Sequence, residues 1–129
     1  MASLPEFETN NLAGALEALT EEEIDHLPFG VIGIDPEGVV RVFSKAEAKL
    51  SGYGARPTLG KVFFTDIAPC MANSHFKGRI DKARAAGALN ISFTFIGDFE
   101  DSNRELSIRV QSAKDGGTWI AIKRENLSS

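Results

Sequence analysis

The sequence has few residues from which a covalent or metal-bound framework could be built. Its 129 residues include one cysteine, two histidines, one tryptophan and one tyrosine. A single cysteine cannot close an internal disulfide, and together with His26 and His75 it matches no recognised metal-ligand spacing. We therefore expect no metal site. The fold must depend on an apolar core, which a chain of this length can bury without disulfides or a metal.

Long apolar runs and an excess of basic residues are also missing. No segment approaches the roughly 20 apolar residues of a membrane span. The start, MASLPEFETN, has neither the basic region nor the apolar stretch of a secretion signal. The net charge of −4 argues against a broad nucleic-acid surface. We therefore expect a cytoplasmic protein that binds neither nucleic acid nor membrane.

Helical spacing and capping signals predict two short helices near the N-terminus. The apolar residues of NNLAGALEAL fall at helical spacing, with Thr9 or Asn10 as the cap. In TEEEIDHL, Thr20 and Glu23 form a capping-box pattern. We expect three parts, an N-terminal helical cap, a core and a tail or linker start, over residues 1–28, 29–125 and 126–129.

The remainder of the chain predicts one antiparallel sheet with short helices between its strands. FGVIGIDPEGVVRVF indicates two strands joined by a DPEG turn, and NISFTFI, RELSIRVQ and TWIAIKR indicate three more. Between them, SKAEAKLSG indicates a short helix. SHFKGRIDKARAAG indicates a longer helix, with Ser74 as its cap and Gly87 at its end. This order predicts an α+β domain with a five-stranded antiparallel sheet and flanking short helices.

The lone cysteine, Cys70, follows Pro69 and admits two interpretations from the residues alone. A free cysteine is most often a small buried apolar residue. A thiol enzyme would instead pair Cys70 with a base such as His75, but no third group that would orient the base stands at a recognisable spacing.

Several segments resemble the photoactive yellow protein family. GKVFFTDIAPC, residues 60–70, is similar to that family's chromophore-attachment segment, and PFGVIGID, AEAKLSG, LNISFTF and WIAIKR are similar to other segments in the same order. The resemblance implies a PAS-like fold, in agreement with the order of elements above. It also implies that Cys70 carries 4-hydroxycinnamic acid (p-coumaric acid) as a thioester, aimed in part by Pro69, whose ring restricts the backbone.

The function that the resemblance implies is a blue-light photoreceptor domain and not an enzyme. Light would isomerise the chromophore, a proton would move between a buried glutamate and the ring oxygen, and the N-terminal helices would loosen. The implied partners are the chromophore and a downstream signalling domain or partner protein. The alternative is a PAS-like interaction module without a chromophore.

Glu47 has two competing roles. It matches the family's protonated glutamic acid, which donates a hydrogen bond to the chromophore's ionised ring oxygen. For that role the pKa of Glu47 must rise well above about 4.3, through burial beside a negative charge. Spacing alone favours a capping box, in which Glu47 would reach back to the backbone of Ser44. The resemblance favours the donor role, and the other pocket residues that it implies are Ile32, Phe63, Ile67, Pro69 and Phe95.

Four positions depart from the family pattern. Phe43 replaces a tyrosine, so a second donor to the ring oxygen is lost. Ser51 replaces the threonine that supports this tyrosine, and it retains a hydroxyl that would serve as an alternative donor. Tyr53 replaces a pocket-covering arginine and Asp101 a loop methionine. We therefore expect a red-shifted visible band, or a mixture of that band with a near-ultraviolet band from the protonated chromophore.

Overall fold

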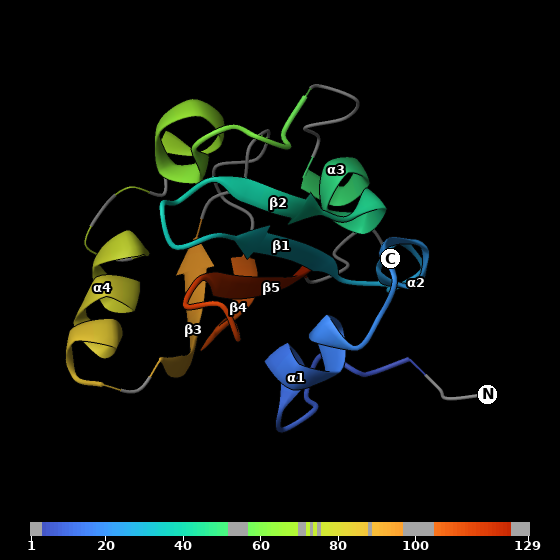
Figure 1. Ribbon diagram of the computed structural model, residues 1–129, viewed down its shortest axis with the longest axis horizontal. Helices are drawn as coiled ribbons and strands as arrows, with labels where there is room; N and C mark the ends of the chain where they lie inside the picture. Colours follow the sequence, from blue (N-terminus) through green and yellow to red (C-terminus); the bar gives the residue numbers. More distant parts are fainter. Residues whose placement is uncertain are drawn as a thin grey trace.

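The computed structural model describes residues 4–51, 57–69, 72, 74, 76–87, 89–96 and 105–124. These residues form four α-helices, one π-helical turn and five strands (Figure 1). In chain order the elements are α1 (Leu12–Glu17), α2 (Glu21–Asp25), β1 (Gly30–Ile34), β2 (Val40–Phe43), α3 (Lys45–Ser51), the π-helical turn η1 (Phe63–Ile67), α4 (Lys77–Ala85), β3 (Asn90–Ile96), β4 (Glu105–Ser112) and β5 (Thr118–Arg124).

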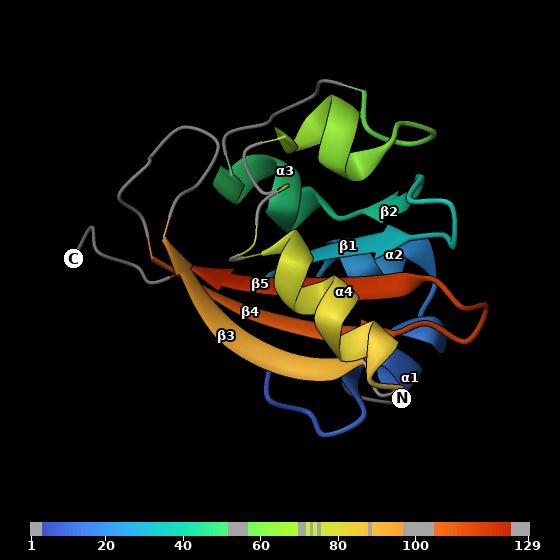
Figure 2. The ribbon, with the colours of Figure 1, turned by 90° about the vertical axis from the view of Figure 1, so that its left-hand side faces the viewer.

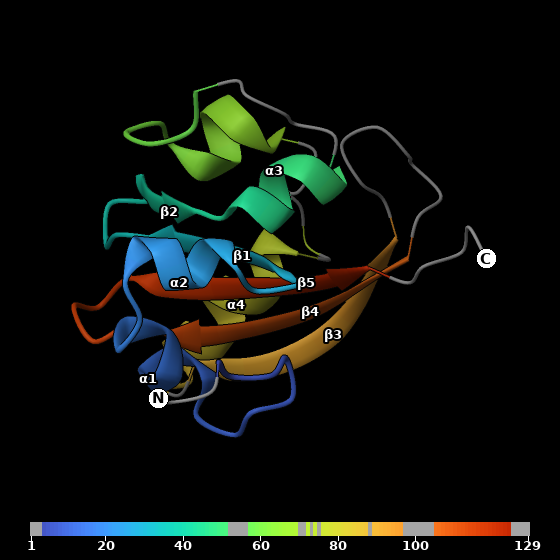
Figure 3. The same ribbon diagram turned by 90° about the vertical axis from the view of Figure 1, so that its right-hand side faces the viewer.

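The five strands form one antiparallel sheet in the order β2-β1-β5-β4-β3. Figures 2 and 3 view its two faces: α4 crosses one face, and α1 and α2 cover the other. The predicted α+β class and five-stranded antiparallel sheet are therefore confirmed. The predicted boundaries of cap, core and tail stay predictions. Among the described residues, no helix is long and apolar enough to cross a membrane.

Each face of the sheet packs against its own apolar cluster. The first cluster joins alternate residues of the strands, such as Ile32, Ile108 and Ile120, to η1 and α4. The second joins the opposite face, including Val31 and Ala121, to the N-terminal helices. All five residues of β1 are buried because this strand is covered on both faces. The sheet thus separates the N-terminal helices from the cluster that contains η1.

The structure confirms one predicted helix cap and corrects another. Thr20 and Glu23 form the predicted capping box, since each side chain accepts from the other residue's backbone N–H. The cap of α1 is Asn11, whose side chain accepts from the Gly14 N–H at 3.2 Å. The prediction of Thr9 or Asn10 is wrong, because the Thr9 hydroxyl accepts from an earlier backbone N–H, that of Glu6.

The start of α4 is fixed by packing, in contrast to the predicted Ser74 cap. The helix begins at Lys77, with Phe76 at the cap position and no side-chain capping bond. Phe76 is fully buried, and its ring meets the rings of Phe93 and Phe95 edge to face at 5.5 and 5.1 Å. Aromatic burial of this kind outweighs one exposed capping bond.

The turn between β1 and β2 depends on Asp35. Its Oδ1 accepts from the N–H groups of Glu37 and Val39, and its Oδ2 accepts from Arg41 Nε, all at 2.9 Å. Gly38 has a φ of 87°, which a glycine adopts without strain. The hydrogen bond from Val39 is the main cause that lowers the pKa of Asp35; burial opposes it, and bonds from Arg41 and Glu37 add to it.

We expect Asp35→Asn to lower the free energy of unfolding at neutral pH and to have a smaller effect in acid. A lowered folded-state pKa adds stability above the unfolded-state value, ordinarily near 3.8, and this stability is lost as the pH falls through the folded-state pKa. Urea unfolding of both proteins at pH 7 and in acid measures the difference. An equal difference at both pH values would show that the charge of Asp35 does not matter.

Candidate functional site

A buried ion pair joins α3 to the end of β5. Glu47 and Arg124 have side chains that are 0% and 1% exposed. Arg124 Nη1 donates to Glu47 Oε1 and Nη2 donates to Oε2, both at 2.9 Å. A bidentate pair of this kind is a strong charge-assisted contact. The contact compensates two charges that would each be costly to bury alone.

Local structure explains how Glu47 comes to lie there. The Ser44 hydroxyl accepts from the N–H of Val31 at 3.0 Å and from the N–H of Glu47 at 3.2 Å, which ties the start of α3 to β1. Gly30 provides the space for the carboxylate. A Cβ added at Gly30 would lie 2.0 Å from Glu47 Oε1, so only glycine allows the carboxylate this close to β1.

The capping box predicted from S-x-x-E spacing is only half formed. Ser44 does cap the helix, but its own N–H donates to the carbonyl of Val31 at 2.9 Å, and Glu47 binds Arg124. The capping role of Glu47 is therefore wrong, because a strand neighbour and a distant arginine provide better partners. The donor role of Glu47 toward a chromophore stays a prediction.

Most of the predicted pocket residues lie in α3 or in the apolar cluster that contains η1. Phe43 pairs with Ile32 across β1 and β2 and directly precedes Ser44. Ser51, at the end of α3, is 2% exposed. One buried apolar cluster contains Ile32, Phe63 and Ile67, and the partly buried Phe43 and Phe95 pack against it. Pro69 is exposed, whereas Cys70, Tyr53 and Asp101 lie outside the described residues.

The π-helical turn η1, which has no signal in the hydrophobic pattern, contributes two of these residues. The N–H of Ala68 donates to the Phe63 carbonyl at 2.8 Å, the bond that defines this wider turn. It places Phe63 and Ile67 in the core, and the ring of Phe63 meets that of Phe64 edge to face at 4.8 Å. The turn therefore forms one apolar wall of the cluster, directly before the segment that leads to Cys70.

Sequence reasoning missed Arg124, although the strand pattern contained a signal. In TWIAIKR, Arg124 is in phase with Ile120 and Ile122, which are both fully buried, whereas Lys123 is out of phase and exposed. A charged residue in phase with buried apolar residues requires a buried partner. The sequence did not identify that partner.

This arrangement suits an aromatic ligand with one acidic end. Apolar and aromatic side chains of the cluster are suited to contact a planar ring, and Glu47, Arg124 and Ser51 carry groups that are able to hydrogen-bond a phenolic oxygen. The residues present are therefore compatible with a phenolic group such as 4-hydroxycinnamic acid. Tyr53 cannot be placed in this arrangement, since it lies outside the described residues.

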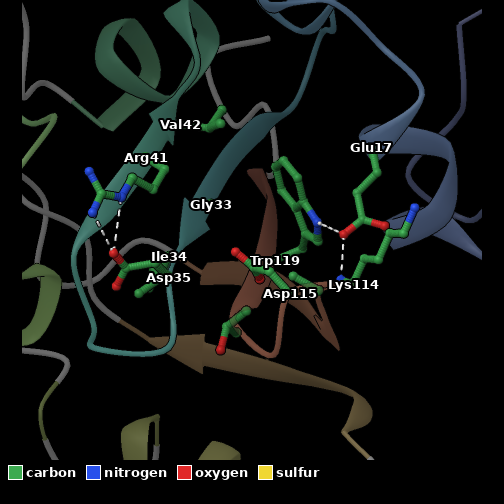
Figure 4. Close-up of a pocket in the computed structure, with 11 residues that line it drawn as sticks. Glu17, Gly33, Ile34, Asp35, Arg41, Val42, Lys114, Asp115 and Trp119 are labelled. Atoms are coloured by element: carbon green, nitrogen blue, oxygen red, sulfur yellow. Dashed lines mark hydrogen bonds and ion pairs between the residues drawn. The ribbon is translucent and has the colours of Figure 1, made fainter.

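A separate hollow of about 540 Å³ lies between β1, β2 and α1 (Figure 4). Glu17 of α1 borders it, and its Oε2 accepts from the indole Nε1 of Trp119 at 3.1 Å and from the Lys114 N–H at 2.6 Å. The Asp35–Arg41 pair borders the same hollow. Glu17 thus connects α1 to β5 and to the turn before it.

Polar side chains of β4 hold the segment before α1. Arg109 Nη1 donates to the carbonyls of Phe7 and Thr9, both at 2.6 Å. Gln111 donates to the carbonyl of Asn10 at 3.1 Å and accepts from the N–H of Ala13 at 2.7 Å. The N-terminal segment is therefore attached by side-chain contacts and an apolar cluster, without pairing into the sheet.

Comparisons with known proteins agree with this geometry. The family model described as the PAS fold matches residues 18–120. The photoactive yellow proteins of Rhodothalassium salexigens and Halochromatium salexigens are 32% and 29% identical, over 92% of this chain and 95% of each relative. The crystal structure of the photoactive yellow protein domain from the sensor histidine kinase Ppr of Rhodospirillum centenum matches with a TM-score of 0.76 and 32% identity, over 86% of this chain and 98% of that one. With its PAS fold and these relatives, the chain belongs to the photoactive yellow protein family.

Proposed function

We propose that this chain is a blue-light photoreceptor domain that carries 4-hydroxycinnamic acid as a thioester on Cys70. Membership of the family supports a photoreceptor-like role, sensory and not enzymatic. The observation that carries the proposal is the buried Glu47–Arg124 pair beside an apolar cluster that contains Phe63 and reaches Arg124 through its strand neighbour Leu106. Such a site combines the two environments that a phenolic chromophore needs.

Each part of the site has a distinct role in this proposal. The chromophore supplies a double bond that light isomerises and a ring oxygen that exchanges a proton. Holding a phenol as an anion at pH 7 requires about 4 kcal/mol of selective stabilisation, given its ordinary pKa of about 10. Glu47, Arg124 and Ser51 are the described groups that would supply it by charge and hydrogen bonding. The apolar cluster would exclude water from the ring.

The N-terminal segment is the part of the fold that would respond to light. A hollow of about 460 Å³ is lined by Leu50 and Arg124 together with residues 4–8. A change at the Glu47–Arg124 pair would therefore reach a segment that is attached only by side chains. We propose that this segment and the N-terminal helices loosen, which a downstream signalling domain or partner protein would detect.

We expect Cys70→Ser to abolish covalent pigment while preserving the fold. A serine is nearly the same size as cysteine, but it cannot form the thioester. Both proteins are incubated with activated 4-hydroxycinnamic acid, denatured and examined by mass spectrometry, and circular dichroism checks the fold. A serine variant that keeps the pigment through denaturation would place the attachment elsewhere. A parent chain that takes up no pigment would favour an interaction module without a chromophore.

A further inference from the structure

We propose that the outer edge of β3, together with the groove between β3 and α4, is a docking site for an extended acidic segment of a partner protein. The segment would pair with β3 as an added strand of the sheet. In strand addition of this kind, main-chain hydrogen bonds supply affinity and side-chain contacts supply specificity. The inference goes beyond the proposed photoreceptor function and requires no chromophore.

The outer edge of β3 has none of the usual protection against pairing with another chain. This strand is last in the sheet order β2-β1-β5-β4-β3, and no strand among the described residues lies beyond it (Figure 2). Its sequence, NISFTFI, contains no charged residue and no proline, and its register with β4 is continuous. Edge strands are ordinarily protected by charges, proline or bulges, so this edge is open to a further strand.

The opposite edge of the sheet, β2, is covered by the chain itself. The Val40 N–H donates to the carbonyl of Lys61 at 2.8 Å, and the Val40 carbonyl accepts from the N–H of Gly60 at 2.9 Å. A bridge between Val39 and Val62 continues this contact. Of the two edges, β3 is therefore the one that can accept a partner.

The register of β3 and β4 identifies the backbone groups that point outward. Ser112 and Leu89 lie opposite each other, one position beyond the Asn90–Gln111 pair, and the Ser112 N–H donates to the Leu89 carbonyl at 3.0 Å. Hydrogen-bonded pairs alternate with non-bonded pairs along an antiparallel ladder, so every second residue of β3 directs its backbone groups away from β4. These residues are Asn90, Ser92, Thr94 and Ile96.

A groove of about 450 Å³ lies between β3 and α4 beside this edge. The small side chains of Ala83 and Ala86 line it on the helix side, and Ile91 and Phe93 line it on the strand side. Ile91 and Phe93 are only partly buried by the rest of the molecule. A strand added to β3 would place alternate side chains on this face of the sheet, so apolar residues of the segment would cover Ile91 and Phe93.

The charges beside the groove favour an acidic segment. The exposed Arg79 and Lys82 line it, and the guanidinium of Arg79 lies 5.2 Å from the centroid of the Phe93 ring. The helix α4 has four basic residues and one acidic residue, Asp81, although the whole chain has a net charge of −4. A second copy of the chain is a poor occupant, because antiparallel pairing of two β3 strands would bring two basic α4 helices to the same face.

The experiment titrates the full chain into a fluorescently labelled peptide in which valine and threonine alternate between aspartates at both ends. We expect saturable binding by fluorescence anisotropy, which weakens as the salt concentration rises. A control peptide with lysines in place of the aspartates is expected to bind at least roughly fivefold more weakly, because its charge is reversed. A second control keeps the aspartates and has every valine and threonine amide N-methylated. It cannot pair as a strand, and no binding is expected.

Two substitutions test the charge and the strand pairing separately. Lys82→Glu is expected to weaken binding of the acidic peptide by roughly fivefold, about the most that one exposed ion pair contributes. Lys49→Glu makes the same change at an exposed position of α3 and is expected to bind like the parent. Ser92→Pro removes an outward N–H without removing a bond to β4, and we expect a loss of roughly tenfold or more. Ser92→Ala keeps the backbone and is expected to bind like the parent.

Amide hydrogen exchange of the parent chain, followed by NMR, tests the pairing without any variant. The acidic peptide is expected to slow exchange at the outward amides of Asn90, Ser92, Thr94 and Ile96. The amides between them, which already face β4, are expected to change little. Protection without this two-residue period would overturn strand addition, and so would binding of the N-methylated peptide.

Three further results would overturn the acidic partner. They are absence of binding up to millimolar peptide, equal binding of the acidic and basic peptides, and equal effects of Lys82→Glu and Lys49→Glu. Protection of the outward amides that grows with protein concentration, without any peptide, would make a second copy the occupant and would also overturn the inference. All of these measurements use the chain without pigment, so their outcome is independent of the proposed photoreceptor function.

Discussion

Glu47→Leu is expected to cost the chromophore-free protein about 3–5 kcal/mol of its free energy of unfolding, the usual effect of removing one partner from a buried ion pair. The substitution leaves the guanidinium of Arg124, whose side chain is 1% exposed, without its carboxylate. Leucine fills most of the space, so the loss reports charge more than volume. Urea unfolding monitored by circular dichroism measures it.

Two controls make this result specific to the buried pair. The double variant Glu47→Leu/Arg124→Met removes both charges, and it is expected to recover most of the lost stability. Arg41→Met breaks the Asp35–Arg41 pair, in which Arg41 is 64% exposed, and a much smaller loss is expected there. If Glu47→Leu were as mild as Arg41→Met, the buried pair would not be an important part of the folded state.

Gly30→Ala is expected to destabilise the protein by about 1–3 kcal/mol, the range for overpacking a buried site. Backbone propensity predicts the opposite sign, since alanine in a strand interior is ordinarily better than glycine by roughly 0.5–1 kcal/mol. The new Cβ would lie 2.0 Å from Glu47 Oε1. That atom belongs to a flexible side chain, but Arg124 holds it in place, so it cannot move without disturbing the ion pair.

Thermal and urea unfolding of Gly30→Ala in two backgrounds tests this reason. In the parent background we expect destabilisation, and in a Glu47→Ala background we expect the same substitution to be much less harmful, because the carboxylate is gone. A stabilising effect in the parent would show that strand propensity outweighs the clash. An equal loss in both backgrounds would place the clash with other atoms near Gly30.

The features that were predicted correctly depend on contacts between residues close together in the chain. The capping box joins Thr20 to Glu23, and the DPEG turn is closed by a bond from the Gly38 N–H to the Asp35 carbonyl at 2.9 Å. The strands follow from alternation, because neighbouring side chains point to opposite faces. The exposed Ser92 and Thr94 and the half-buried Phe93 show this pattern on β3. Such signals are contained in short segments and can be recognised without information about the rest of the chain.

Of the features that were missed, the start of α4 and the partner of Glu47 are decided by residues far away in the chain, whereas Thr9 is engaged by a residue only three positions earlier. Packing of Phe76 against β3 fixes the start of α4 in place of the predicted Ser74 cap. The Thr9 hydroxyl accepts a hydrogen bond from the Glu6 N–H and so does not cap α1. In each case the sequence supplied a suitable side chain. The contacts formed in the folded structure determine which partner each side chain binds.

Glu47 shows most clearly the difference between what local sequence determines and what tertiary contacts determine. The sequence by itself placed it on a short helix after a strand, and it allowed two roles that need the same residue type. Only the tertiary structure brought Arg124, 77 residues later, into contact with it and left the Ser44 N–H to the Val31 carbonyl. Helix and turn signals operate within about four residues, whereas the partner of Glu47 depends on which strand ends beside it in the sheet. The pairing of β1 with β5 determines that Arg124 is this partner, because it places Arg124 at the same end of the sheet as Gly30 and α3.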